Sequence, residues 1–276
     1  MESPTLPSPP ASSPDTSVLV AQLTDSHLFA DADSKLLGMN TADSLQRVID
    51  RLLTEQPRID LMLATGDLSQ DGTIESYQRF LNMTARIPAP ARWLPGNHDE
   101  YLAMNQFSAG TDRLKPVVDV GGWRIILLNT AVPGNVYGFL AEDQLRLLQN
   151  ALQQAPQRPS LICLHHHPVS IGCAWMEPIG LRNAAEIFAV TDRYPQVRGI
   201  LWGHVHQEFD QMRNGVRLLA TPSTCVQFMP GSEDFQADKE APGYRWLRLY
   251  AEGRLETGVS RVADIDFEID YSCEGY

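Results

Sequence analysis

Five short polar segments each directly follow an apolar run, and their residue types suit metal ions. They are Asp25-Ser26-His27, Gly66-Asp67, Gly96-Asn97-His98-Asp99, His165-His166-His167-Pro168 and Gly203-His204-Val205-His206. Carboxylate, imidazole and amide oxygen together are ligands for Fe, Mn, Zn or similar ions, and none of these segments offers a thiolate. Because functional residues of open α/β sheets gather beyond the carboxyl ends of the strands, we expect the five segments to converge on one crevice.

The spacing within two of these segments predicts paired ligands. Asp25 and His27 are separated by one residue, and so are His204 and His206. Side chains at positions i and i+2 share a face of an extended chain, so each pair is expected to point the same way. Asp67 is a single carboxylate between the two pairs and is placed to bridge two ions. Two ions about 3.5–4 Å apart activate a hydroxide and clamp the attacking and leaving oxygens of a phosphoryl transfer.

Each segment alone has an ordinary structural interpretation. Asp25-Ser26 could cap a helix, and His204 and His206 could be a hydrogen-bonded pair near the surface. Glycines 66, 96 and 203 fit tight strand exits, where only glycine adopts a positive φ cheaply. The five segments occur together, each at a predicted strand end, and this joint pattern favours a metal site.

The elements that position these segments alternate between strands and helices. Short runs rich in Val, Ile and Leu predict buried strands at Val18–Leu23, Leu61–Thr65, Arg92–Leu94, Trp123–Leu128, Leu161–Leu164 and Gly199–Trp202. Amphipathic stretches predict helices at Thr41–Gln56, capped by Thr41, and at Thr73–Arg86, Glu142–Gln154 and Leu181–Arg193. Two late runs, Tyr244–Tyr250 and Arg254–Val262, predict a hairpin. The alternation indicates an α/β layered fold.

Composition indicates one domain after a short tail. The chain has 276 residues, of which 43% are hydrophobic. Residues 1–17 are rich in Ser and Pro and predict a disordered tail, which leaves 18–276 as the domain. No apolar run reaches the ~20 residues that cross a bilayer, and the N-terminus lacks the features of a signal peptide. The four cysteines are scattered, which fits a reducing compartment, so we expect a cytoplasmic protein.

The net charge of −12 argues against nucleic acid as a partner. A protein that grips a phosphate backbone needs clustered Lys and Arg, and the sequence has no such cluster. An acidic protein that handles phosphate needs a local reversal of charge, which bound divalent cations supply.

The order of the five segments resembles that of the calcineurin-like metallophosphoesterases, and the resemblance spans residues 18–206. A finer likeness to the bacterial class III 3′,5′-cyclic-AMP phosphodiesterases covers nearly the whole chain. It is carried by Leu37-Gly38-Met39-Asn40-Thr41, Leu164 to Pro168, Leu181-Arg182-Asn183-Ala184, Thr221 to Phe228 and Glu274-Gly275-Tyr276. The resemblance implies an αββα sandwich of mixed sheets flanked by helices.

The resemblance also implies a role for each site residue. The first metal would be held by Asp25, His27 and His206, and the second by Asn97, His165 and His204, with Asp67 bridging them. His166 is the alternative to His165, since some relatives keep this ligand two residues before the proline. His98 would face the phosphate and protonate the leaving oxygen as a general acid. The substrate would contact His27, Asp67, Asn97, His98 and His206.

The activity implied is metal-dependent hydrolysis of 3′,5′-cyclic AMP to 5′-AMP by a metal-bridging hydroxide, with two divalent ions, Fe²⁺ or Mn²⁺, as cofactors. A related phosphodiesterase acting on other diesters such as glycerophosphodiesters would share every ligand. A non-catalytic metal-binding scaffold is the alternative from another class. Outside the ligand set, Trp175 and Phe228 could stack on an adenine or pack in the core, and Cys225 could line the substrate pocket or be buried.

Overall fold

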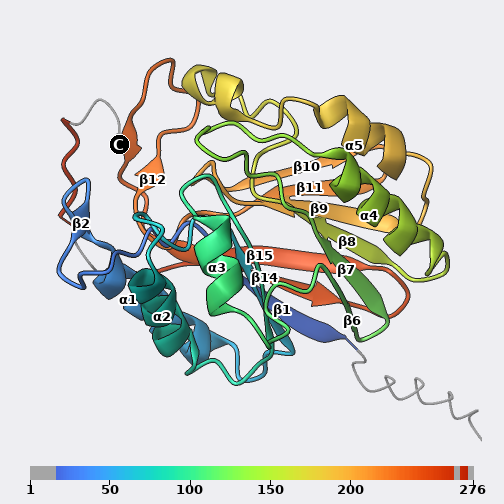
Figure 1. Ribbon diagram of the computed structural model, residues 1–276, viewed down its shortest axis with the longest axis horizontal. Helices are drawn as coiled ribbons and strands as arrows, with labels where there is room; N and C mark the ends of the chain where they lie inside the picture. Colours follow the sequence, from blue (N-terminus) through green and yellow to red (C-terminus); the bar gives the residue numbers. More distant parts are fainter. Residues whose placement is uncertain (1–16, 264–267, 273–276) are drawn as a thin grey trace, which may run out of the picture.

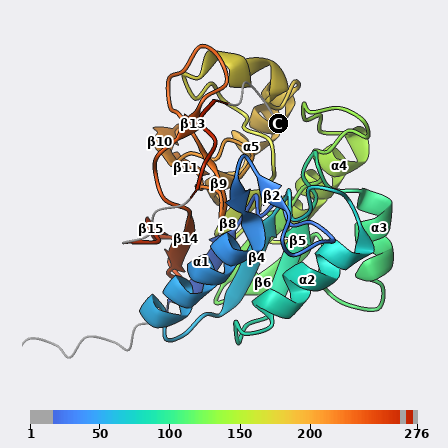
Figure 2. The ribbon, with the colours of Figure 1, turned by 90° about the vertical axis from the view of Figure 1, so that its left-hand side faces the viewer.

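Two mixed β-sheets lie face to face in the middle of the molecule, and helices cover the outer face of each (Figure 1; Figure 2). The computed structural model describes residues 17–263 and 268–272. The layered αββα arrangement expected from the sequence is confirmed. Most of the predicted tail and the terminal Glu274-Gly275-Tyr276 lie outside the described residues. Among the described residues, no helix combines the length and apolar character needed to span a membrane.

The first sheet has the strand order β15-β14-β1-β4-β5. Its strands are β1 Val18–Leu23, β4 Leu61–Thr65, β5 Ala91–Leu94, β14 Gly243–Leu249 and β15 Leu255–Arg261. Strands β1, β4 and β5 run parallel, while β14 pairs antiparallel with β1 and forms the predicted hairpin with β15. Its outer face is covered by α1 Thr41–Glu55, α2 Ile74–Thr84 and α3 Tyr101–Phe107.

The second sheet has the strand order β10-β11-β9-β8-β7-β6. Its strands are β6 Val117–Val120, β7 Trp123–Leu127, β8 Ser160–Cys163, β9 Val197–Trp202, β10 Phe209–Arg213 and β11 Val216–Ala220. The four central strands are parallel, and the two edge strands are antiparallel to their neighbours. Helices α4 Glu142–Gln153 and α5 Ala184–Thr191 cover its outer face.

Short elements lie on the loops beyond the strand ends. They are β2 Lys35–Leu36, β3 Met39–Asn40, η1 Ala174–Ile179, β12 Gln227–Phe228 and β13 Ala237–Asp238. The sequence patterns did not predict these elements, nor α3, β6, β10 and β11. Most of them are short, and in β10 the side chains are partly or largely exposed. Strand β11 does carry a run of buried apolar residues, Leu218 to Ala220, that the prediction missed.

The alternation of side chains along β1 explains why both of its faces are buried. Leu19 and Ala21 pack toward the helices, while Val18 and Val20 pack toward the second sheet. A parallel strand covered on both faces reads as a continuous apolar run, which is why its bounds were predicted correctly.

The start of α1 corrects one prediction. The N-cap is Asn40, whose side chain accepts a hydrogen bond from the Asp43 backbone N–H at 2.8 Å. Thr41, which we expected to be the cap, is buried, and its hydroxyl donates to the His27 carbonyl at 3.0 Å. The first turn of α1 is therefore tied directly to a predicted ligand segment.

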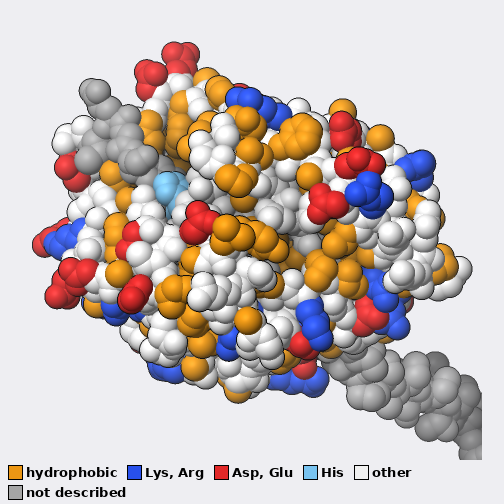
Figure 3. Space-filling view, viewed as in Figure 1, with side chains coloured by type: hydrophobic (Ala, Val, Ile, Leu, Met, Phe, Trp, Pro, Cys, Tyr) orange, Lys and Arg blue, Asp and Glu red, His pale blue; other side chains and the backbone are white. Residues whose placement is uncertain are grey.

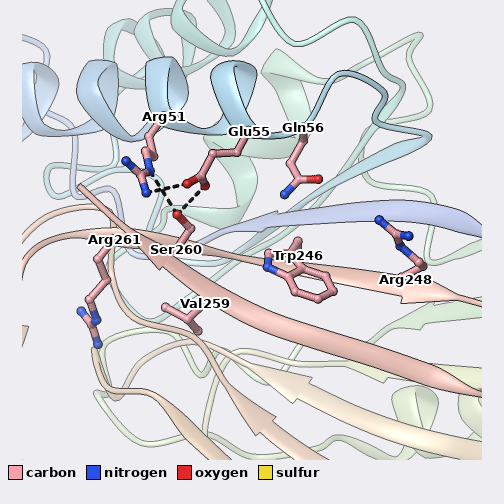
Figure 4. Close-up of a pocket in the computed structure, with 8 residues that line it drawn as sticks. All are labelled: Arg51, Glu55, Gln56, Trp246, Arg248, Val259, Ser260 and Arg261. Atoms are coloured by element: carbon pink, nitrogen blue, oxygen red, sulfur yellow. Dashed lines mark hydrogen bonds and ion pairs between the residues drawn. The ribbon is translucent and has the colours of Figure 1, made fainter. Parts of the chain in front are cut away.

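A groove of about 620 Å³ lies between α1 and the β14–β15 hairpin (Figure 4). Glu55 accepts from both Arg51 and Ser260 within it, and the half-buried Trp246 forms part of its floor. None of the predicted site residues lines this groove. The predicted ligand segments lie elsewhere, beyond the ends of β1, β4, β5, β8 and β9.

Candidate metal centre

The five polar segments converge where the two sheets meet, as the sequence predicts. Three of them follow β1, β4 and β5 of the first sheet, and two follow β8 and β9 of the second. Ligand atoms come within 4.8 Å of one another in four groups: Asp25 with His27 and His206; His27 with Asp67 and His98; Asp25 with Asp67 and His165; and His165 with His166 and His204. Side chains from both sheets thus form one cluster.

Three side chains form the half of the cluster nearest β1. The Nε2 atoms of His27 and His206 are 3.2 Å apart. The Asp25 Oδ1 lies 3.4 Å from the His206 Nε2. All three side chains are buried. Two imidazole nitrogens and a carboxylate oxygen therefore face one small volume, as they would around a single ion.

The other half is built around His165. Its Nε2 lies 3.1 Å from the Asn97 Oδ1 and 3.2 Å from the Asp67 Oδ2. The rings of His165 and His204 lie 5.0 Å apart between centroids. His166 is a neighbour of the same group, but its Nδ1 contacts the Thr130 hydroxyl at 2.8 Å.

Asp67 lies between the two halves. Its Oδ2 is 3.8 Å from the His27 Nε2 on one side and 3.2 Å from the His165 Nε2 on the other. Its Oδ1 accepts a hydrogen bond from the His98 backbone N–H at 2.8 Å. One carboxylate oxygen is thus shared between both groups of ligands, which is the position that a bridging ligand requires.

The backbone at the site differs from the extended chain that we expected. Asp25, His27, Asp67, His204 and His206 all adopt positive φ angles, between 45° and 67°. Each pair therefore converges through left-handed turns rather than through a shared strand face. A non-glycine residue in this region is strained by roughly 1–3 kcal/mol, and such strain persists where the surroundings hold it in place.

The glycines at the strand exits serve two different purposes. Gly66 has the predicted positive φ, at 99°. The prediction is wrong for the other two, which are glycine because of space. A Cβ on Gly96 would lie 2.2 Å from the Asp67 Oδ1, and one on Gly203 would lie 2.1 Å from the Thr24 Oγ1.

Each of four histidines is oriented through one ring nitrogen. Main-chain carbonyls hold three of them: Thr65 O lies 2.9 Å from the His165 Nδ1, Val226 O lies 2.7 Å from the His206 Nδ1, and Ile179 O lies 3.1 Å from the His204 Nε2. His27 is held instead by a side chain, the Gln70 Oε1, at 2.5 Å from its Nδ1. The second ring nitrogen of each then carries the lone pair that a metal needs.

Asp99 fixes the loop that carries Asn97 and His98, a role that the sequence did not reveal. Its carboxylate accepts from the backbone N–H groups of Gly96 at 2.9 Å, Ser69 at 3.1 Å and Leu68 at 3.3 Å. Burial and the nearby Asp67 charge raise its pKa to about 7. The loops after β4 and β5 are thereby joined, and Asn97 is placed beside Asp67.

The electrostatics of the cluster favour a bound cation. Burial alone would raise the pKa of Asp67, but the facing His165 and His98 hold it well below its usual range. Burial opposes charge on His165 as well, yet Asp67 raises the pKa of that imidazole to about 9. Burial lowers the pKa of His27 to about 3, so its ring is neutral, as a metal-ligating imidazole must be.

Several buried nitrogens of the cluster have no hydrogen-bond partner among the described residues. They are the His204 Nδ1, the His166 Nε2 and both ring nitrogens of His167. An unpaired polar atom in the interior is costly unless a ligand completes it. The His204 Nδ1 faces the group that contains His165, so the residues present fit a bound divalent ion.

His98 differs from the other histidines in exposure. Six of the seven histidines are buried, whereas His98 is half-buried. Its ring meets that of His27 edge-on, with 4.9 Å between centroids. Figure 3 shows a small area of histidine surface on one face, and the Lys and Arg side chains there are scattered among Asp and Glu. A substrate arriving from solvent would reach His98 before the buried ligands.

Two residues outside the ligand set pack behind it. Phe228 is buried and stacks face to face on His206, with 4.1 Å between centroids, so its core interpretation is confirmed. Trp175 is half-buried and packs edge-on against Phe228. Cys225 is also buried, with its Sγ 3.2 Å from the Asp25 carbonyl, and burial raises its pKa to about 12. Cys225 therefore contacts the main chain of the turn that carries Asp25.

Comparisons with known proteins agree with this geometry. The family model for "Calcineurin-like phosphoesterase" matches residues 18–208. A Pseudomonas aeruginosa protein named "3',5'-cyclic adenosine monophosphate phosphodiesterase CpdA" is 57% identical over 262 residues, 95% of this chain and 96% of the relative. Its namesake from Escherichia coli K12 is 46% identical, covering 94% and 95%. A dimetal phosphatase from Danio rerio aligns with a TM-score of 0.62 at 15% identity over 89% of this chain and 99% of its own, a likeness of fold.

Proposed function

Because the chain belongs to the calcineurin-like phosphoesterase family, we propose that it hydrolyses 3′,5′-cyclic AMP to 5′-AMP and so lowers the cellular cyclic AMP level. The support for this substrate is the naming of relatives at 57% and 46% identity, each matched over at least 94% of this chain. A Nostoc protein named "3',5'-cyclic-nucleotide phosphodiesterase alr5338" is 43% identical. A cytoplasmic location fits this role, and Cys163, Cys173 and Cys225 are all free thiols.

The proposed ligands divide into two sets that share Asp67. Asp25, His27 and His206 would hold the first ion, and Asn97, His165 and His204 would hold the second. We favour His165 over His166 because its Nε2 lies 3.1 Å from the Asn97 Oδ1 and 3.2 Å from the Asp67 Oδ2. A nitrogen and oxygen donor set without thiolate suits Fe²⁺ or Mn²⁺.

Two such ions, when bound, supply an activated water and neutralise the charge of the phosphoryl group. The chain's own residues do the rest. Asn97 and His98 hold the phosphate, with His27, Asp67 and His206 at its edge. As the water oxygen bonds to phosphorus, the bond to the 3′-oxygen breaks, and His98 donates the proton that this oxygen needs. The half-exposed ring of His98 beside His27 supports that assignment.

The observation that carries the metal site is the sharing of Asp67 Oδ2 between His27 and His165. The test supplies the Mn²⁺-loaded protein with cyclic AMP, a glycerophosphodiester and a phosphomonoester, and resolves the products by chromatography. We expect 5′-AMP and an intact monoester. The variant His98→Ala should lose about 10²–10⁴-fold in kcat, since general acid catalysis contributes about that much. Gln56→Leu, in the groove of Figure 4, is the matched control and should keep full activity.

Other outcomes would separate the alternatives. If cyclic AMP is not hydrolysed while the glycerophosphodiester is cleaved, the proposed metal site is supported and the proposal of cyclic AMP as the substrate is wrong. If no diester is cleaved with Mn²⁺ or with anaerobic Fe²⁺, the chain is a metal-binding scaffold and the proposed activity is wrong.

A further inference from the structure

Among the four histidines proposed as ligands, His27 is oriented in a different way from the rest. The other three are held by main-chain carbonyl oxygens, which no substitution removes. The Nδ1 of His27 meets the Oε1 of Gln70, at 2.5 Å. The geometry points to Gln70 as a positioning residue that sets the affinity of the first metal site. This inference rests on the proposed role of His27 as a ligand.

The backbone around Gln70 places its side chain firmly. The His27 N–H donates to the Asp67 carbonyl at 2.9 Å, and the Leu28 N–H donates to the Leu68 carbonyl at 3.1 Å. The Gln70 N–H then donates back to the Leu28 carbonyl at 2.8 Å. The segment after β1 and the segment after β4 are thus joined like neighbouring strands. Gln70 is held beside His27 by its main chain, and its side chain reaches the ring.

The contact decides which nitrogen of His27 carries the proton. The amide oxygen of Gln70 can only accept, so the His27 Nδ1 must be the donor. The lone pair is then on Nε2, which lies 3.2 Å from the His206 Nε2 and 3.8 Å from the Asp67 Oδ2. Without this acceptor, the ring of His27 would lose both its tautomer preference and its tilt.

The same contact limits rotation of the His27 ring, together with the ring's contacts to His98 and His206. His27 adopts a strained backbone with φ of 45°, and its ring meets His98 edge-on and His206 at an angle of 54°. Outer hydrogen bonds to metal-ligating histidines commonly account for 10–100-fold in metal affinity. We therefore expect an effect of that size at the first site and none at the second, because His165 and His204 are held by main-chain groups.

The experiment compares Gln70→Leu, which removes the acceptor, with Gln70→Glu, which keeps one. Mn²⁺ is titrated into each metal-free protein, and free Mn²⁺ is followed by electron paramagnetic resonance. In Gln70→Leu, one of the two sites should weaken by about 10–100-fold while the other is unchanged. Gln70→Glu should recover most of that loss. The matched control is Gln56→Leu, a half-buried glutamine in a groove that none of the proposed ligands lines, which should leave both sites unchanged.

A second readout does not depend on bound metal. In the metal-free wild type, ¹⁵N chemical shifts should show His27 protonated on Nδ1, and Gln70→Leu should shift this population toward Nε2. Two site affinities within twofold of wild type, together with an unchanged His27 tautomer, would overturn the role of Gln70. If the wild type binds Mn²⁺ but cleaves no cyclic AMP, the proposed activity fails while the role of Gln70 is still decided by these two measurements.

Discussion

Two clusters of buried polar side chains lie within the molecule, and they differ in how their hydrogen bonds are completed. Arg245 of β14 is only 1% exposed, yet its guanidinium donates to Thr221 at 3.2 Å, Thr257 at 3.2 Å and the Ala220 carbonyl at 2.7 Å. The histidine cluster at the strand ends leaves the His204 Nδ1 unpaired. Protein groups complete the first cluster, whereas the second needs ligands from outside the chain.

A chain of contacts links the two clusters. The Thr221 hydroxyl donates to the side-chain oxygen of Gln22. The side-chain NH₂ group of Gln22 in turn donates to the Thr65 hydroxyl at 2.7 Å. The Thr65 carbonyl lies 2.9 Å from the His165 Nδ1. Hydrogen-bonded side chains between the two sheets thus connect Arg245 to His165, which lies in the histidine cluster at the strand ends. Burial of a polar group is therefore a sign of function only when its partners are missing.

The largest expected effect is on the functional cluster. Replacing Asp67 with Ala removes the carboxylate shared by both halves, so bound Mn²⁺ should fall from two ions and kcat should drop by about 10³-fold or more, since several kcal/mol of charge stabilisation is lost. The protein should remain folded, although less stable, because Asp67 lies outside the hydrophobic clusters that form the core. Near-normal turnover in Asp67→Ala would contradict the shared-ligand assignment. Asp31→Asn, an exposed acidic residue outside the site, is the control.

The opposite pattern is expected for Arg245→Met. Its removal takes a donor from the buried Ala220 carbonyl, the buried Thr221 hydroxyl and the half-buried Thr257 hydroxyl, which should lower the free energy of unfolding by about 2–4 kcal/mol. Urea denaturation measures this loss. The variant should still bind two Mn²⁺ and should retain most of its kcat at a temperature where it stays folded. If Arg245→Met were as stable as the wild type but bound less Mn²⁺, Arg245 would belong to the metal site and the distinction between the two clusters would be wrong.

A smaller effect on the free energy of unfolding is expected when the pH of the metal-free protein is lowered. Burial lowers the pKa of His167 to about 4 and that of His27 to about 3, while both titrate near 6.5 when unfolded. Below pH 6.5 the unfolded chain therefore binds more protons than the folded chain, and the free energy of unfolding falls as the pH drops toward 4. Thermal melts after chelation should show this decline, and His167→Asn should weaken it.

The alkaline side should behave in the opposite way. Burial opposes charge on His165, but Asp67 raises its pKa to about 9, so the stability from this pair is fully present below pH 6.5 and is lost as the pH rises through about 9. Arg245 keeps its charge over this range, since burial lowers its pKa only to about 10. A metal-free melting temperature that is flat from pH 4 to 9 would contradict the account of the histidine cluster.

The sequence predicted where the site lies but not how its backbone turns. Because parallel strands end at one edge, apolar runs followed by Asp25, Asp67 or His165 were enough to place these residues together. Asp and His adopt left-handed conformations more often than most residues, but residue type alone does not single out Asp25 and His27, which contacts with the segment after β4 hold in place. The same is true of Gly96, whose size is dictated by Asp67.

Two features were within reach of sequence reasoning and were missed. Asn214-Gly215 joins β10 to β11 with positive φ at both residues, which is the strongest short hairpin signal. Gln70 lies three residues after Asp67, on the segment that returns past His27, and could have been weighed as a partner for that ring. By contrast, Asn40 as the N-cap of α1 needed the structure, because the adjacent Thr41 is also a favourable capping residue.

The most direct test of the central claim is a count of bound ions. Metal-free protein is dialysed to equilibrium against Mn²⁺, and the metal content is measured for the wild type, Asp67→Ala and Arg245→Met. The account predicts two ions per chain in the wild type and in Arg245→Met, and fewer than two in Asp67→Ala. A wild type that binds no Mn²⁺, or an Asp67→Ala variant that still binds two ions, would show that the buried histidine cluster is not a two-metal site.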